Sequence, residues 1–114
     1  MNNGYQLGCV KAATRILGDK WTPVLLRSFF SAEHVRFCVL QENTKGINPR
    51  TLSARLVMLE HNGIITRHGD SRRCEYTLTE KGRDLLPILQ QMESWSKKHS
   101  PEYSANLQAL KIYS

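Results

Sequence analysis

The chain has little that could build a covalent framework or a metal centre. Its three cysteines, Cys9, Cys38 and Cys74, lie far apart and form no Cys-x-x-Cys pair. This number and spacing predict neither a disulfide framework nor a zinc site. The four histidines are equally scattered and lack the spacing of metal ligands. We therefore expect neither a metal nor a cofactor.

Catalytic and membrane signals are also missing. The sequence has no glycine-rich phosphate loop, no His-Glu-x-x-His, no Gly-x-Ser-x-Gly and no paired carboxylate cluster, which argues against an enzyme. No apolar run approaches the length of a membrane span, and the first six residues lack the basic start and apolar stretch of a secretory signal. We expect one cytoplasmic domain over residues 1–114, with a core at about 9–99 and a polar tail at 100–114.

Positive charge is in surplus. The chain has 16 lysines and arginines against 10 acidic residues, a formal net charge of +6. A surplus of this size is weak evidence for a nucleic-acid partner, so the placement of the charges matters more. Five arginines fall within residues 50–73, at positions 50, 55, 67, 72 and 73.

Residues 47–63 predict a short helix with clear boundaries. Asn48 suits the N-cap, Pro49 suits the first helical position, and Gly63 supplies a left-handed stop. Leucines recur at i, i+4 and i+7, which marks a buried side: Leu52, Leu56 and Leu59. The other side carries small or donor-rich side chains that can contact base edges in a major groove: Arg50, Thr51, Ser53 and Ala54. Asn48, at the helix start, is also a predicted DNA contact. The alternative is an ordinary surface helix.

The next segment predicts a β-hairpin. Two β-prone runs, Ile64 to His68 and Cys74 to Leu78, flank a Gly/Asp/Ser turn that carries Arg72 and Arg73. The order of capped helix, glycine, strand, basic turn and strand is the layout of a winged helix-turn-helix. A solvated basic loop is the alternative for the turn alone, but its spacing from the preceding helix favours DNA binding.

The rest of the chain predicts further helices. They cover Gly8 to Leu17, Trp21 to Phe30, Val35 to Asn43, and Thr79 to about Lys98, with a kink at Pro87. Asp19 can cap the second helix, and the pair 35–43 and 49–62 forms the helix-turn-helix unit. We expect the fold class to be mainly α with one small β-hairpin.

Several further roles follow from these helices. Arg36, near a helix start, is a candidate phosphate contact, with a solvated helix start as the equal alternative, and Arg55 lies beside the buried stripe as a structural residue. Cys38 and Cys74 are expected to be inert core residues. The last helix carries a long apolar stripe that a small domain cannot cover alone, which predicts a dimer contact. Its residues are Leu85, Leu89, Met92 and Trp95. A short helix is possible at 106–112.

These residues resemble the HxlR-type family of winged helix-turn-helix transcription regulators, within the broader MarR-like group. The resemblance runs from about Cys9 to His99. It rests on Gly18-Asp19-Lys20-Trp21, Arg36-Phe37-x-x-Leu40, Asn48-Pro49-Arg50-Thr51-Leu52-Ser53-x-Arg55-Leu56, Thr79-x-Lys81-Gly82-Arg83 and Trp95. It implies a homodimer, joined through its first and last helices, on a near-palindromic DNA operator. The resemblance also implies base-facing positions for four residues of the 47–63 segment: Arg50, Thr51, Ser53 and Ala54. It places Arg72 and Arg73 on the wing.

Two departures from the family pattern matter. The wing is shorter than the usual proline-containing version. Many members also begin the first helix with a Cys-Pro pair, and some sense oxidants or electrophiles there; here Gly8-Cys9-Val10 stands about one residue out of register. We expect no redox switch at Cys9, with a sensor role for Cys9 as the alternative.

The rival function is a winged-helix module that binds a protein and no DNA. The two functions differ in their response to salt. Binding through several DNA phosphates weakens steeply as salt rises, whereas an apolar protein interface hardly changes.

Overall fold

The computed structural model describes residues 2–70 and 73–100, with side chains from Gly8 onward. The elements in chain order are α1 (Asn2–Leu17), α2 (Thr22–Arg27), β1 (Val35–Arg36), α3 (Phe37–Asn43), α4 (Pro49–His61), β2 (Ile65–His68), β3 (Glu75–Leu78), α5 (Glu80–Arg83) and α6 (Leu86–His99). Arg72 and the tail with its possible helix at 106–112 lie outside the described residues. The mainly helical fold with a small antiparallel sheet agrees with the predicted fold class.

The sheet has three strands in the order β1-β3-β2, all antiparallel. Its third strand, β1, was not predicted, because two residues are too short to show an alternating pattern. Consequently α3 starts at Phe37 rather than at Val35. Ile65 lies opposite Leu78, and Arg67 opposite Tyr76.

The core joins this sheet to the helices. Leu52, Leu56 and Leu59 of α4 are buried, as the predicted stripe requires. They share one apolar cluster with Leu25 and Leu26 of α2, which are almost fully buried. Burial of these side chains provides most of the driving force for folding.

Both predicted ends of α4 are confirmed. The side-chain oxygen of Asn48 accepts a hydrogen bond from the amide of Arg50 at 2.7 Å, which satisfies one of the free donors at the helix start. Pro49 occupies the first turn. Gly63, with φ of +74°, takes the left-handed conformation that ends the helix.

Helix α2 is shorter than predicted. It ends at Arg27, and Ser28 to Phe30 form turns instead of continuing the helix. The predicted capping role of Asp19 is confirmed, since its Oδ1 accepts from the amides of Trp21 and Thr22, each at 2.8 Å. The apolar pattern still placed Leu25, Leu26 and Phe29 correctly in the core.

The prediction of one kinked final helix is wrong. The segment is broken at Asp84 and Leu85 into α5 and α6, and Pro87 lies in the first turn of α6. A proline has no amide hydrogen to donate back to the preceding turn, so it fits a helix start better than an interior. Thr79 caps α5 as predicted, accepting from the amide of Gly82 at 3.0 Å.

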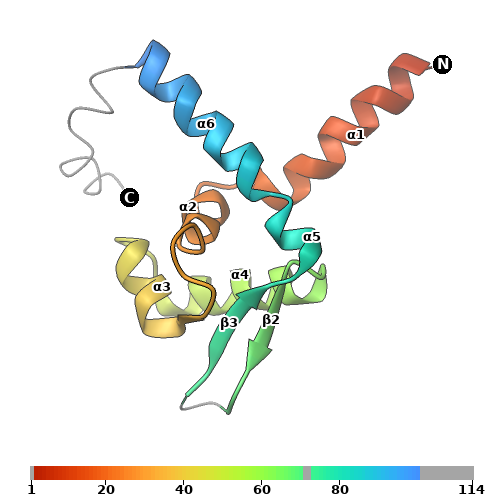
Figure 1. Ribbon diagram of the computed structural model, residues 1–114. Helices are drawn as coiled ribbons and strands as arrows, with labels where there is room; N and C mark the ends of the chain where they lie inside the picture. The colour runs from red at the N-terminus through yellow and green to blue at the C-terminus, as the bar shows by residue number, and fades with distance from the viewer. Residues whose placement is uncertain (1, 71–72, 101–114) are drawn as a thin grey trace.

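Two helices extend away from the body. In Figure 1, α1 and α6 diverge on the side opposite to the β2–β3 hairpin, and α4 lies between these arms and the hairpin. No helix within the described residues is long and apolar enough to cross a membrane.

Candidate nucleic-acid interface

The exposed face of α4 is the first part of the candidate interface. Arg50, Ala54 and Val57 recur at i, i+4 and i+7 and are all exposed, so they share one side of the helix. Val57 is 63% exposed. Sequence reasoning missed Val57, although its spacing from Arg50 and Ala54 was a usable signal. An exposed valine here can contact the methyl group of a thymine.

Two of the predicted base-facing residues lie on the flanks of this face. Ser53 is exposed and lines a groove beside the hairpin. Thr51 is half-buried and lies toward the opposite flank, one helical turn from Arg55. Asn48 is exposed, with its side chain engaged in the cap.

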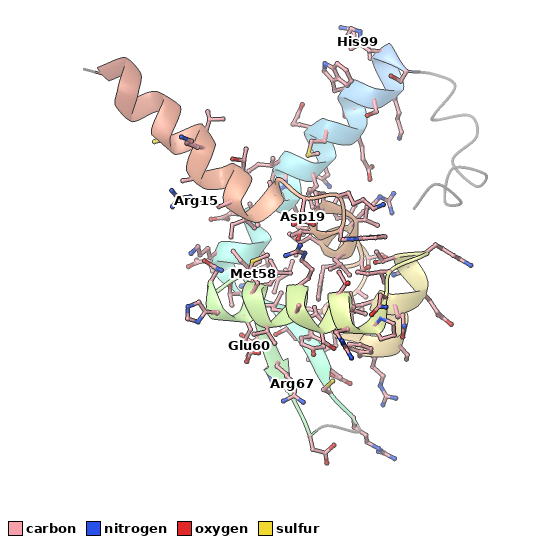
Figure 2. The ribbon with its side chains drawn as sticks, turned by 180° about the vertical axis from the view of Figure 1, so that it is seen from behind. Arg15, Asp19, Met58, Glu60, Arg67 and His99 are labelled. Atoms are coloured by element: carbon pink, nitrogen blue, oxygen red, sulfur yellow. The ribbon has the colours of Figure 1, made fainter. Side chains whose placement is uncertain are left out.

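A groove of about 650 Å³ runs between α4, the hairpin and the start of α3. Three arginines from three elements line it: Arg36 from β1, Arg67 from β2, and Arg73 from the turn before β3. Ser53, Val57 and Glu60 line the α4 side. Figure 2 shows Glu60 and Arg67 on the hairpin side of α4. The groove therefore collects positive charge next to the exposed face of α4.

Arg67 is a candidate contact that the predicted set did not include. Hydrogen bonds to the side chains of Tyr76 and Cys74 raise its pKa above the usual value, and its guanidinium is charged at neutral pH like that of any arginine. The thiol of Cys74 lies 3.8 Å from the Tyr76 hydroxyl. No periodic signal in the sequence marks Arg67, because only Ile65 of β2 is buried and the three residues after it are all exposed.

Of the two arginines predicted on the wing, one lies within the described residues. Arg73 is exposed, and its amide donates to the carbonyl and side-chain oxygens of Asp70 at 3.2 and 3.0 Å. These bonds link Arg73 to the residue that follows the first half of the hairpin. Arg72, its predicted partner, lies outside the described residues.

Glu75 organises the outer side of the sheet. It lies opposite Arg36 on β1 and His68 on β2, so the three side chains share one row. Its carboxylate is 3.1 Å from Nδ1 of His34. The contact between Glu75 and His34 therefore ties the residue before β1 to the hairpin.

The cysteines differ from expectation. Cys38 is exposed and Cys74 is half-buried, and both line the groove. The prediction of two core residues is therefore wrong for Cys38, since α3 begins at Phe37 and turns its first residues toward the groove. Cys9 is exposed on α1. Within the described part of the chain, no group of His, Cys, Asp or Glu could hold a metal ion.

The predicted dimer stripe divides into two parts. Leu85 is half-buried against the core and Leu89 is only 4% exposed. Met92 and Trp95, farther along α6, are 47% and 63% exposed. Ile88 on α6 and Val10 on α1 are further large apolar side chains in solvent. The arms thus carry apolar surface that this chain leaves open.

Comparison with known proteins decides the family. Residues 16–104 match the HxlR-like helix-turn-helix family. The chain belongs to this family. A relative from Mycobacterium tuberculosis, the HTH-type transcriptional regulator Rv3095, is 38% identical over 104 residues, which cover 89% of this chain. The match spans only 65% of that relative. The matched family is a helix-turn-helix family, and this relative is named a transcriptional regulator, in agreement with the class of protein that the sequence predicts.

Solved structures of two regulators have the same fold. The redox regulator HypR, in its oxidised form, superposes with a TM-score of 0.72 at 31% identity, covering 79% of this chain and 95% of that one. The reduced transcriptional regulator YodB of Bacillus subtilis gives a TM-score of 0.66 at 29% identity, covering 79% and 90%. The winged helix-turn-helix prediction is thereby confirmed.

Proposed function

We propose that this chain is a sequence-specific DNA-binding transcription regulator that acts as a homodimer on a near-palindromic operator. One observation carries the proposal: an exposed face on α4 adjoins a groove lined by Arg36, Arg67 and Arg73. A helix face with this composition fits a major groove, and the arginines fit the phosphates beside it.

Base contacts belong to α4 in this proposal. Arg50, at the helix start, presents a fork of donors that matches the O6 and N7 acceptors of guanine. Ala54 and Val57 supply apolar contact with thymine methyl groups, and Ser53 supplies a hydroxyl at the groove. Thr51 has less surface to offer, because it is half-buried.

Phosphate contacts belong to the arginines. Arg36, Arg67 and Arg73 approach the groove from separate elements, so a strand that leaves α4 toward the wing would pass all three. Such contacts supply affinity without reading sequence. Arg72 joins this group as a sequence-based proposal.

The dimer is supported by the exposed residues of the two arms. Large apolar side chains are exposed on both arms: Met92 and Trp95 on α6, and Val10 on α1. A second copy of the chain supplies an equal apolar surface, and twofold symmetry of the protein would match an inverted repeat in DNA.

A sensor role for Cys9 is not part of the proposal. One neighbour is named a redox regulator, and another, YodB, is described in a quinone-bound form. Cys9 is exposed on α1, but exposure alone does not make a thiol reactive. The nature of any effector is left to direct binding measurements on the wild type and Cys9→Ser.

The test is a selection of bound duplexes from a random DNA pool. We expect the wild type to enrich one inverted repeat, and Arg50→Ala to lose the preference at one base pair of each half. Lys98→Ala, which removes the same charge from the far end of α6, should select the wild-type sequence. A wild type that enriches no sequence would contradict the proposal and favour the protein-binding module.

A further inference from the structure

The short helix α2 is tied by an ion pair near each end to a different helix. Asp19, before its start, faces Arg55 of α4, and Arg27, its last residue, pairs with Glu93 of α6. We propose that α2 acts as a strut that positions α4 relative to α6, and so sets the spacing of the two half-sites. This inference rests on the proposed DNA-binding dimer.

The Asp19 carboxylate is held firmly against α2. Its Oδ1 accepts from the amides of Trp21 and Thr22 at 2.8 Å, and its Oδ2 accepts from the Thr22 hydroxyl at 2.7 Å. Thr22 is fully buried. The carboxylate therefore moves only together with the start of α2.

Arg55 reaches this fixed carboxylate from α4. Its Nε lies 3.7 Å from Asp19 Oδ1 and is buried without a hydrogen-bond partner among the described residues. A buried charged nitrogen without a hydrogen bond is stabilised mainly by the nearby carboxylate, and removal of that carboxylate would leave its charge uncompensated. Figure 2 shows Asp19 on the side of α4 from which α1 and α6 extend, away from Arg67 and the wing. The pair thus joins α4 to the arm side of the molecule.

The other end of α2 meets the proposed dimer helix. Arg27 pairs with Glu93 of α6, which follows Met92 in the sequence but faces another side of the helix from Trp95. The Arg27 guanidinium also lies over the Phe30 ring, 5.3 Å from its centroid. A displacement of α6 at the contact with a second copy would therefore be passed to α2 at Arg27.

Directional contacts add to the geometry that the apolar core provides. Leu25 and Leu26 of α2 and the leucines of α4 share one cluster, and the hydrophobic driving force behind it is non-directional. In some proteins a polar pair selects one arrangement among several packed ones. The proposed half-sites lie about one DNA turn apart, roughly 34 Å, and a shift of about 3.4 Å at α4 equals one base pair.

The experiment varies the spacer between the half-sites that the wild type selects. Asp19→Asn keeps an oxygen for the helix cap but removes the charge opposite Arg55, and Arg55→Gln removes the other partner. We expect the wild type to prefer one spacer by about tenfold over spacers one base pair shorter or longer, and both variants to lose most of that preference. Their preference for the half-site sequence should stay unchanged.

Two further variants make the result independent of damage to α4. Arg27→Gln acts at the exposed end of the strut, far from the cap, and should also broaden the spacer preference. Asp84→Asn removes an exposed carboxylate outside the strut and should behave as wild type. Variants that keep the wild-type spacer preference would overturn this inference alone, whereas a wild type without any selected repeat would overturn the proposed function as well.

Discussion

Gly82 of α5 lies directly against the carbonyl oxygen of Ile64, the residue before β2. A Cβ on Gly82 would be only 2.1 Å from that oxygen. The same junction holds Thr79, whose hydroxyl donates to the carbonyl of Gly63 at 2.6 Å, and Lys81, whose Nζ donates to the carbonyl of Asn62 at 2.8 Å. The Thr-Glu-Lys-Gly-Arg segment thus fastens the end of α4 to the start of the wing.

We expect Gly82→Ala to destabilise the fold. The added methyl group meets backbone rather than a flexible side chain, and forced overpacking of this kind typically costs about 1–3 kcal/mol. Gly8→Ala is the matched control, because a Cβ there would meet nothing within 4 Å. Denaturant unfolding of both variants measures the difference. Equal stability of Gly82→Ala and Gly8→Ala would show that the backbone at this junction shifts to accommodate the methyl group without a measurable loss of stability.

Acid should weaken the fold partly through Asp19. Partial burial alone would raise the pKa of Asp19, but hydrogen bonds from Thr22 and Trp21 and the charge of Arg55 outweigh it, and the pKa lies below its usual 3.8. A carboxyl whose pKa is lowered by folding stabilises the protein above its unfolded pKa and loses this effect as the pH falls through the folded value.

The measurement is the free energy of unfolding between neutral pH and the region below 3.8. Asp19→Asn should be less stable than wild type at neutral pH, and the gap should narrow as the pH falls into that region. A gap that is constant with pH would mean that the charge of Asp19 contributes nothing to stability.

Replacement of Arg50 and replacement of the groove arginines should weaken DNA binding in different ways. Arg50→Ala should cost about 1–3 kcal/mol on the selected sequence and relax the preference at one base pair. Arg67→Ala with Arg73→Ala should weaken binding to all duplexes alike and flatten the salt dependence by about two units. If Arg50→Ala weakened selected and random duplexes equally, Arg50 would be a phosphate contact.

The dimer should depend on the exposed part of α6. Met92→Asp with Trp95→Asp should give monomers, because unpaired carboxylates are costly in an apolar interface. Both side chains are exposed in the single chain, so its fold should survive, as circular dichroism would report. Leu89 is unsuitable for this test, since it belongs to the core. Sedimentation of the wild type as a monomer at micromolar concentration would exclude the dimer.

Local signals explain what the sequence predicted well. The cap at Asn48, the stop at Gly63 and the leucine stripe of α4 all act within one helix, so they can be recognised without knowledge of the fold. The same holds for the caps at Asp19 and Thr79. The position of α4 next to a hairpin followed from the order of these elements.

Contacts between distant segments explain the rest. Strand β1 exists because Val35 and Arg36 pair with β3, about forty residues later, and two residues carry no periodic signal. The convergence of Arg36, Arg67 and Arg73 on one groove depends on that pairing. The exposure of Cys38 and the contact between Asp19 and Arg55 likewise depend on tertiary packing, which spacing along the chain does not encode.

The most direct test of the central claim is the binding of two labelled duplexes across a range of salt concentrations, followed by fluorescence anisotropy. One duplex carries the selected inverted repeat, and the other has the same base composition in scrambled order. We expect tighter binding to the repeat at every salt concentration, and a loss of affinity by orders of magnitude between about 50 and 200 mM salt for both duplexes. Equal binding of the two duplexes, or affinity that hardly changes with salt, would contradict a sequence-specific DNA-binding regulator.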